Sequence, residues 1–145
     1  MSDDYACLKL ENQLCFPLYV CSKEIVRKYH PMLDELDLTY TQYIVMMAMW
    51  EKPKCPMNDL GKTLYLDSGT LTPVLKSLES KGFISRERSK DDERAVIVSL
   101  TPEGIALRDR AVNVPGMMAS CIDIDAEDAK TLYSILYKIL DKIKE

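Results

Sequence analysis

The sequence has little of what marks several large classes of protein. Across its 145 residues no apolar run approaches the roughly 20 residues of a membrane-spanning helix, so no membrane association is expected. The N-terminal segment MSDDYACLKLENQ is acidic and lacks the basic segment and long apolar core of a secretory signal. We therefore expect a cytoplasmic location. The sequence also has no internal repeat and no low-complexity segment.

Metal-binding patterns are also missing. His30 is the single histidine, no CxxC pair occurs, and no cluster of acidic residues and cysteines lies near His30 at metal-ligand spacing. We expect no metal and no other cofactor. Because structural disulfides are rare in the cytosol, most of the cysteines are interpreted as small buried hydrophobic residues. There are five of them, an odd number: Cys7, Cys15, Cys21, Cys55 and Cys121.

What the sequence does contain is typical of one globular domain, with 47% hydrophobic and 29% charged residues. Its clearest pattern is a helix from Asp67 to Gly82 with one apolar face. Asp67 or Ser68 can cap the start by accepting a hydrogen bond from a free first-turn N–H group, and Gly82 can end the helix in the left-handed conformation. Between them, apolar residues recur at helical spacing: Leu71, Val74, Leu75 and Leu78.

A β-hairpin is predicted directly after this helix. The strand-like residues Phe83 and Ile84 precede a polar and highly charged run from Ser89 to Arg94, and a second strand-like run from Val96 to Leu100 follows it. Two short strands around such a tip are typical of a hairpin. A helix followed by a charged hairpin is typical of the recognition helix and wing of a winged helix-turn-helix.

Both elements carry side chains suited to DNA. Small hydroxyl groups and a long cation can reach phosphates or base edges in a major groove, and an arginine at a hairpin tip can enter a narrow minor groove. The alternative is a solvated helix and an ordinary charged turn. The candidates on the helix are Ser68, Thr70, Thr72, Lys76 and Ser77, and those on the hairpin are Arg86, Arg88, Lys90 and Arg94.

The net charge of −4 weakly disfavours DNA binding, because phosphate groups are neutralised by Lys and Arg. The distribution of charge matters more than the total. Basic residues concentrate on the predicted helix and hairpin, whereas acidic residues dominate the N-terminal segment and the run from Asp123 to Asp128. DNA binding is therefore not excluded.

The hairpin resembles the wing of the MarR family of transcription regulators. Asp92, which thereby joins the DNA-binding candidates, and Arg94 form the DxR motif, and a strand then leads to LTxxG at Leu100 to Gly104. The segment YLDSGTLTPVLKSLESKG resembles the recognition helix of the organic hydroperoxide resistance regulators within that family. The resemblance covers nearly the whole chain and implies a mainly α fold with a small β-hairpin wing. In this single domain, residues 1–145, a winged helix-turn-helix over 35–103 lies between dimerisation helices at 5–34 and 104–145.

Residues 5 to 30 have a long helical pattern with a broad apolar surface, which Pro17 interrupts. Proline is accommodated easily only in the first turn of a helix. The main helix therefore either begins near Cys15 or is kinked there. In the first case free N–H groups at the helix start favour a thiolate, so the Cys15 thiol is either reactive or a buried inert group.

The resemblance favours a reactive thiol. The segment LENQLCFPLY is similar to the peroxide-sensing segment of the organic hydroperoxide resistance regulators, which have a reactive cysteine where Cys15 stands, although Pro17 replaces the helix-friendly residue usual there. The family also uses tyrosines of the neighbouring subunit to hydrogen-bond this thiolate, and Tyr19, Tyr29 and Tyr40 occupy the matching positions. For each tyrosine the alternative is packing at an interface. Phenols can donate to a thiolate while their rings line a pocket for an apolar peroxide.

A second cysteine is implicated by the same resemblance. Some members of the family carry a resolving cysteine in the C-terminal region of the other subunit, and Cys121 lies in about that region. Cys121 either forms an intersubunit disulfide with oxidised Cys15 or leaves that role to a low-molecular-weight thiol. Cys21 is a poorer partner, because residues i and i+6 of one helix point to different faces.

Local signals predict the elements between the first helix and the recognition helix. His30-Pro31 is expected to end the first helix, since the residue before proline resists the helical conformation. Thr39 or Thr41 can cap an almost wholly apolar, buried helix over 40–50, whose methionines are expected to fill the core rather than line a ligand pocket.

A loop with two prolines is expected over 51–56, and then a short helix over 59–65 that Asn58 caps. After the hairpin, Thr101-Pro102-Glu103 is a strong start for another helix. The regular apolar stripe of the last helix suits pairing with a second copy of the chain. This stripe consists of Leu132, Ile135, Leu136, Ile139, Leu140 and Ile143.

The sequence thus predicts a homodimeric transcription repressor, not an enzyme, that binds a pseudo-palindromic operator in double-stranded DNA through two recognition helices in successive major grooves. The expected effector is an organic hydroperoxide, which oxidises the Cys15 thiolate to a sulfenic acid and then to a disulfide and so lowers DNA affinity. An alternative is a MarR-type repressor released by a small aromatic ligand, with Cys15 merely structural. A thiol peroxidase is disfavoured by the missing CxxC motif and by the wing.

Overall fold

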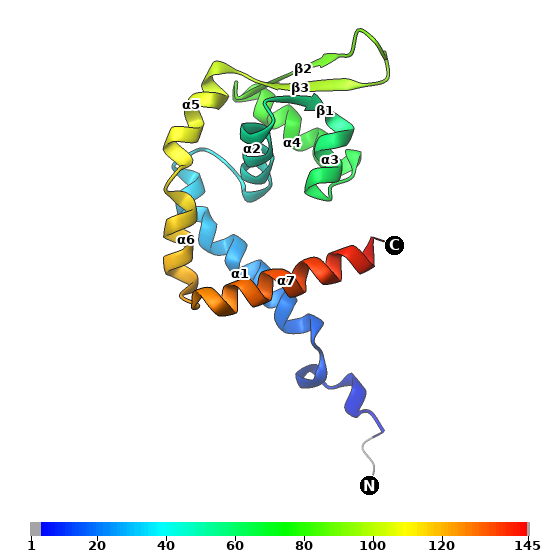
Figure 1. The fold of residues 1–145 in the computed structure, drawn as a ribbon, viewed down its shortest axis with the longest axis vertical. Helices are drawn as coiled ribbons and strands as arrows, with labels where there is room; N and C mark the ends of the chain where they lie inside the picture. The colour runs from blue at the N-terminus through cyan, green and yellow to red at the C-terminus, as the bar shows by residue number, and fades with distance from the viewer. Residues whose placement is uncertain (1–3, 145) are drawn as a thin grey trace. The chain divides into compact units, whose positions relative to one another are not determined.

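The structure, a computed structural model, describes residues 4–144 (Figure 1). The chain divides into two compact units, of which the first ends at Val114 and the second begins at Pro115. Within the described residues no helix is long and apolar enough to cross a membrane. The elements in chain order are η1 (Ala6–Leu8), η2 (Leu10–Asn12), α1 (Cys15–Asp34), α2 (Tyr40–Glu51), β1 (Lys54–Pro56), α3 (Met57–Leu64), α4 (Ser68–Ser80), β2 (Ile84–Arg88), β3 (Val96–Leu100), α5 (Pro102–Ala111), α6 (Val114–Ile122) and α7 (Ala126–Ile143).

The first long helix, α1, begins at Cys15 and not at residue 5. The preceding residues form the short 3-10 helices η1 and η2 instead. The side-chain amides of Asn12 and Gln13 stabilise these turns by donating to the carbonyl oxygens of Ala6 and Cys7, each at 2.7 Å. Pro17 lies in the first turn of α1, where its missing N–H group would have no partner within the helix. Of the two alternatives for Pro17, a helix start near Cys15 is therefore the one realised.

The predicted end of α1 at His30-Pro31 is wrong, because the helix continues to Asp34. A proline costs a helix one N–H bond and crowds the preceding turn, but Pro31 is so close to the end that little of the helix is affected. Leu33, which is buried, anchors this last turn in the core. Its carbonyl oxygen accepts hydrogen bonds from the backbone N–H groups of Leu36 and Leu38, each at 3.0 Å. These bonds close the turn that leads to α2.

Helices α2, α3 and α4 form the helix-turn-helix region. Thr39 caps α2 through a reciprocal capping box with Gln42, in which each side chain accepts from the other residue's backbone N–H. Asp67 caps α4 by accepting from the backbone N–H of Thr70 at 2.7 Å, as predicted. The predicted cap at Asn58 is wrong. Helix α3 begins at Met57, after the extended Pro56, so Asn58 already lies inside the first turn.

Strands β2 and β3 form the predicted hairpin, which projects beyond α4 in Figure 1. The expectation of a plain loop over 51–56 is wrong, because Lys54 to Pro56 pair with β3 as a third, antiparallel strand. Pro56 is tolerated in β1, and Pro53 directly before it, because β1 lies at the edge of a sheet with strand order β1-β3-β2. The mainly α class with a small β-hairpin wing is confirmed.

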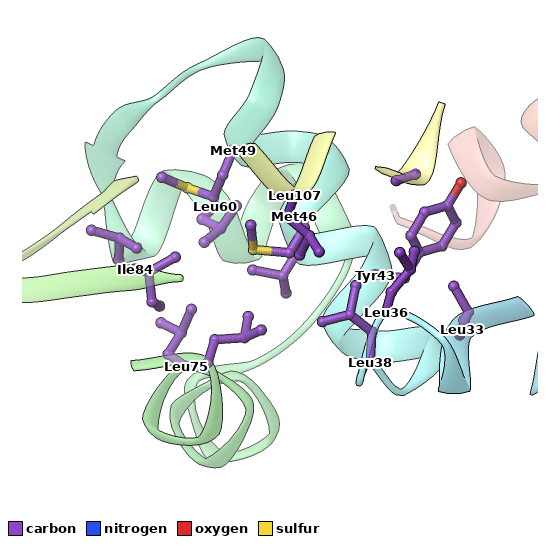
Figure 2. Packing of buried hydrophobic residues seen from close by; sticks show 14 of the residues in the cluster. Leu33, Leu36, Leu38, Tyr43, Met46, Met49, Leu60, Leu75, Ile84 and Leu107 are labelled. Carbon is purple, nitrogen blue, oxygen red and sulfur yellow. The ribbon is translucent and has the colours of Figure 1, made fainter. Parts of the chain in front are cut away.

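One cluster of buried residues joins the elements of the first unit (Figure 2). Met46 and Met49 of α2 are fully buried at its centre, so the expectation that the methionines fill the core is confirmed for these two. The apolar face of α4 packs into the same cluster through Leu71, Leu75 and Leu78. The recognition helix is therefore fixed to α2 by apolar burial, which leaves its opposite face free.

Two glycines fix the ends of the hairpin. Gly82 has φ +84, the left-handed conformation that ends α4 as predicted. Gly104 allows α5 to approach the backbone of Phe83, the residue before β2, since a β carbon at Gly104 would lie only 2.1 Å from the carbonyl oxygen of Phe83. Thr101 caps α5 by accepting from the N–H of Gly104 at 3.0 Å. The glycine of the LTxxG motif is thus required by close backbone contact at the root of the wing.

The second unit contains most of α6 and all of α7. Asp125 caps α7 by accepting a hydrogen bond from the backbone N–H of Asp128 at 2.8 Å, as the acidic run predicted. The predicted apolar stripe is present on α7, and much of it faces solvent: Leu132 is 48% exposed, Ile135 47% and Ile143 73%. A single chain does not bury this face.

Candidate DNA-reading surface and thiol site

The face of α4 away from the core carries most of the predicted DNA-binding side chains. Ser68, Thr70 and Lys76 are exposed, and Thr72 is half-buried. Ser77 is different, because its hydroxyl oxygen accepts a hydrogen bond from the side-chain amide of Gln42 at 2.9 Å. The hydroxyl of Ser77 therefore serves the contact between α2 and α4. Ser68, Thr72 and Lys76 follow one another at i, i+4 spacing along one side of the helix, and Thr70 is exposed on another side of its first turn.

Hydrogen bonds shape the tip of the wing. The guanidinium of Arg88 donates from Nη1 to the carbonyl oxygen of Glu93 at 2.7 Å, across the tip. Asp92 accepts from the backbone N–H of Arg94 at 3.0 Å, which orders the turn in which both residues lie. Lys90 and Arg94 are exposed. Two of the predicted residues thus hold the tip in shape, and two present cations to solvent.

Arg86 faces the protein and not solvent. Its Nη2 atom lies 3.1 Å from Oε1 of Glu79, and its backbone N–H donates to Oε2 of the same carboxylate at 3.0 Å. Its Nε atom is buried. The hydrogen bond from the Arg86 side chain holds the pKa of Glu79 below its usual value. This ion pair connects β2 to the last turn of α4, so the wing and the recognition helix are held at a fixed angle.

Arg94 also lies next to the recognition helix. A shallow hollow is lined by Arg94 from the wing, by Ser68 at the start of α4, and by Pro56 and Asn58 near the start of α3. A DNA backbone passing over this hollow would meet the helix start and the wing together. Loops and helix termini of this kind commonly contact phosphate groups.

Cys15 is the first residue of α1 and is exposed. No side chain caps this helix start, so no side-chain oxygen accepts a hydrogen bond from the N–H groups of the first turn. Tyr19, one turn further along α1, is 61% exposed, and Lys23 Nζ lies 5.6 Å from the centre of its ring. The thiol and the first of the predicted tyrosines therefore share an accessible stretch of one helix.

The other two predicted tyrosines lie in a cluster with a third. The ring centres of Tyr29 and Tyr40 are 4.9 Å apart, and those of Tyr29 and Tyr43 are 5.7 Å apart. Burial raises the pKa of all three phenols, and mutual repulsion of their charged forms adds to the effect at Tyr29 and Tyr43. The hydroxyl groups therefore keep their protons at neutral pH and can donate hydrogen bonds.

One chain does not bring Cys15 and this cluster together. Tyr29 is on the same helix as Cys15 but fourteen residues further along, which corresponds to about 21 Å at the rise of an α-helix. That distance is far beyond a hydrogen bond. Cys15 with Tyr19, and Tyr29 with Tyr40, are thus two separate groups within a protomer.

The interpretation of most cysteines as buried hydrophobic residues is wrong for the single chain. Cys7, Cys15, Cys21 and Cys121 are exposed, and Cys55 is buried. Cys55 lies on β1, where its thiol is 3.8 Å from the sulfur of Met49, and burial raises its pKa. The four exposed cysteines lie on η1, α1 and α6, and their exposure depends on tertiary packing that the sequence pattern alone does not reveal.

Sequence reasoning did not single out three residues of this site: Gln42, Tyr43 and Glu79. Tyr43 was assigned only to the apolar helix. Gln42 had a detectable signal, since Thr39 followed three residues later by Gln is a capping-box pattern. Glu79 had none, because its partner is defined only once β2 folds back on α4. In the part of the chain that the structure describes, no three His, Cys, Asp or Glu side chains could hold a metal ion.

Comparisons with known proteins place this arrangement in a family. The family model described as transcriptional regulator SarA/Rot matches residues 27–110. The organic hydroperoxide resistance transcriptional regulator of Bacillus subtilis (strain 168) is 44% identical over 145 residues, which covers 100% of this chain and 99% of that relative.

Solved structures of AbfR, a protein of Staphylococcus epidermidis, are also similar. Reduced AbfR bound to DNA has a TM-score of 0.80 and 33% identity, covering 95% of this chain and 96% of that one. Disulfide-formed AbfR has a TM-score of 0.68 and 33% identity, covering 95% and 94%. These relatives are DNA-binding transcription regulators, so the expectation that the chain is not an enzyme is confirmed. The chain belongs to the MarR family of transcription regulators, with a SarA/Rot-type winged helix, as its resemblance to the organic hydroperoxide resistance regulators predicted.

Proposed function

We propose that the protein is a homodimeric repressor whose affinity for its operator falls when an organic hydroperoxide oxidises Cys15. The observation that carries the proposal is the separation, within one chain, of an exposed thiol at a helix start from a cluster of protonated tyrosines. Thiolate and phenol groups so far apart meet only if a second copy of the chain supplies one of them. The oxidation state of one sulfur then acts directly on the geometry of a dimer.

Exposed apolar surface at both ends of the chain supports the dimer. Clustered apolar side chains in contact with water favour association, and a second copy of the chain can bury them against the same surface of its own. Two recognition helices related by a two-fold axis would then read the two halves of a pseudo-palindromic operator. The exposed side chains before and within the start of α1 are Tyr5, Leu8, Leu10, Leu14, Phe16 and Leu18.

The DNA contacts divide by element. Ser68, Thr70, Thr72 and Lys76 are proposed to enter the major groove, because they lie on the parts of α4 that its core face leaves accessible. Lys90 and Arg94 are proposed to contact the backbone or the minor groove from the wing. Three further residues keep the wing in place for this contact, namely Arg86 through Glu79, Arg88 through Glu93, and Asp92 through the Arg94 backbone.

The proposed chemistry begins with attack by the Cys15 thiolate on the outer oxygen of the hydroperoxide. The O–O bond breaks, its electron pair goes to the inner oxygen, and that oxygen takes a proton and leaves as an alcohol. The sulfur loses two electrons and becomes a sulfenic acid, while the peroxide gains the same two. A second thiol, from Cys121 of the other subunit or from a low-molecular-weight thiol, then displaces water and forms a disulfide.

The relatives support this order of events. The Bacillus subtilis relative is named for resistance to organic hydroperoxides. AbfR has been solved both reduced on DNA and with a disulfide formed. Replacing a thiolate by a disulfide removes the charge to which the phenols donate, so the tyrosine contacts of the reduced dimer are lost.

A gel-shift titration tests the proposal. The probe is a DNA fragment selected from a random library by the reduced protein, and the oxidant is cumene hydroperoxide. We expect the wild-type protein to lose affinity on oxidation and the Cys15→Ser variant to keep it. Cys21→Ser, which changes another exposed thiol on the same helix, is the matched control and should respond like the wild type.

Two outcomes would redirect the proposal. If Cys15→Ser still releases DNA on oxidation, the sensor is elsewhere; if neither protein responds to peroxide but a small aromatic acid releases both, the protein is a ligand-responsive MarR-type repressor. Intact mass spectrometry of the oxidised wild type separates the two fates of Cys15. A covalent dimer that Cys121→Ser abolishes indicates an intersubunit disulfide, and a mixed disulfide indicates a small thiol.

A further inference from the structure

A buried polar network joins the start of α2 to the recognition helix. Gln42 is only 5% exposed, and both ends of its side-chain amide are hydrogen-bonded. Its Nε2 donates to the hydroxyl of Ser77 at 2.9 Å, and its Oε1 accepts from Lys81 Nζ at 3.0 Å. Both partners come from the α4 region, more than thirty residues further along the chain.

The same amide is tied to the turn before α2. Gln42 Oε1 also accepts from the backbone N–H of Thr39 at 3.0 Å, in the capping box. Lys81 Nζ donates to the backbone carbonyl oxygen of Asp37 at 2.5 Å, in the turn between α1 and α2. One buried side chain therefore connects the α1–α2 turn, the first turn of α2 and the end of α4.

The tyrosine cluster sits on the same turn of α2. Tyr40 is the first residue of α2, and Tyr43 follows Gln42 directly. Their ring centres are 6.4 Å apart, and Tyr43 is 2% exposed, so neither ring can shift far without moving the backbone that carries Gln42. Tyr40 and Tyr43 thus share the first turn of α2 with the residue that donates to Ser77.

We propose that Gln42 is the positioning residue that couples the tyrosine site to the recognition helix. This inference rests on the proposed function, in which Tyr40 donates to the Cys15 thiolate of the other subunit. In the reduced dimer the hydrogen bond from Tyr40 to the thiolate holds the first turn of α2 in place. The hydrogen bond from Gln42 to Ser77 then sets the position of α4. When the thiolate is lost, that turn relaxes and α4 moves with it.

A buried amide suits this role because leaving its donor or its acceptor without a hydrogen-bond partner costs free energy. Apolar packing between α2 and α4 has no directional bonds, whereas an amide that loses one partner when buried remains desolvated and unpaired. The contact therefore has discrete arrangements, which is what transmission between two sites requires.

Two variants remove the contact from opposite ends. Ser77→Ala deletes the acceptor on α4, and Gln42→Met keeps the volume of the side chain but removes its polar atoms. Ser80→Ala is the matched control, because it makes the same change at an exposed position of the same helix. For each protein three quantities are measured: operator affinity when reduced, operator affinity after cumene hydroperoxide, and the rate of Cys15 sulfenic acid formation.

We expect the ratio of reduced to oxidised affinity to fall by about five- to thirtyfold in Ser77→Ala and Gln42→Met. The rate of Cys15 oxidation should stay at the wild-type value, and the double variant should resemble either single one. Ser80→Ala should behave as the wild type. If Gln42→Met does not fold, as judged by circular dichroism, Ser77→Ala alone decides.

An unchanged affinity ratio in Ser77→Ala overturns the inference, including the case in which both affinities fall equally. That case would make the contact structural only. Failure of the proposed function looks different, because the wild type itself would then keep its DNA after oxidation, or Cys15 would not be oxidised at all.

Discussion

Leu71, Leu75 and Leu78 of α4 are buried within a single chain, whereas Leu14, Phe16 and Leu18 around the start of α1 are exposed. Both sets are apolar, and Leu14 and Leu18 have the same i, i+4 spacing as Leu71 and Leu75. The first set faces a core that α2, α3 and the sheet complete, whereas much of the second set is in contact with solvent. The helix-turn-helix and wing thus have a complete core of their own, while the start of α1 and the stripe of α7 keep exposed apolar side chains. The proposed DNA contacts lie on the first of these regions, and the proposed thiol site lies on the second.

The largest effect should be a loss of stability on substitution of Gly104, in the region that has its own complete core. We expect Gly104→Ala to destabilise the fold by about 3 kcal/mol or to prevent folding, because the added β carbon would lie 2.1 Å from the backbone oxygen of Phe83. Thermal unfolding followed by circular dichroism measures the loss. Gly116→Ala is the control, since a β carbon there meets nothing within 4 Å. Equal stability of the two variants would show that α5 can move away from Phe83 without a loss of stability.

A charge placed in the exposed apolar stripe of α7 should separate the subunits of the proposed dimer and leave the first unit folded. Ile135→Asp places a carboxylate in the exposed apolar stripe of α7, and burying it at an interface would be costly. We expect sedimentation equilibrium to report half the mass of the wild type at micromolar concentration. Ser134→Asp adds the same charge to the opposite face of α7 and should keep the wild-type mass. A dimer that survives Ile135→Asp would mean that α7 is not part of the interface.

Removing one exposed cation from the wing should affect DNA binding and nothing else. For Arg94→Ala we expect an affinity loss of about five- to tenfold near physiological salt and a salt dependence that is smaller by about one counterion. The rate of Cys15 oxidation should not change. Arg108→Ala, at an exposed position of α5, is the control. A slower thiol reaction in Arg94→Ala would contradict the separation of reading and sensing surfaces.

The smallest expected effect is a pH dependence of stability from the tyrosine cluster. Burial raises the pKa of Tyr43 above the ordinary value of 10.0, so folding favours its protonated form. The stabilisation is complete below pH 10 and is lost as the pH rises through the higher pKa of the folded state. Tyr43→Phe should therefore lose less stability than the wild type between pH 9 and pH 11 in urea unfolding experiments. If the stability of the two proteins changes equally over this pH range, the phenol of Tyr43 is in contact with water in the folded protein.

Local signals in the sequence were enough to predict the reading region. Asp67, Gly82 and Thr101 act at the ends of helices as expected, because a cap is a hydrogen bond or a backbone conformation within a few residues. The same local reasoning was wrong at His30-Pro31 and at 51–56. In both places a contact made elsewhere in the chain, through buried Leu33 or through pairing with β3, outweighs the local preference.

The candidate site was predicted less completely. Cys15, Tyr29 and Tyr40 were named as one site from resemblance, and the structure adds that within one protomer Cys15 is far from the two tyrosines, which contact each other. Arg86 was named as a DNA contact from its charge, yet its guanidinium pairs with Glu79. Charge is visible in a sequence, but whether a charge faces solvent depends on the fold around it.

Residue spacing by itself determined the helix-turn-helix and the wing, because helix periodicity, caps and turns involve neighbours along the chain. Only the tertiary structure decided that Gln42 reaches Ser77 and Lys81 and that Tyr43 joins Tyr29 and Tyr40. Gln42 and Ser77 are 35 residues apart, and nothing in either side chain specifies the other. Their pairing exists because apolar burial holds α2 against α4 and so brings the amide Nε2 of Gln42 within 2.9 Å of the Ser77 hydroxyl.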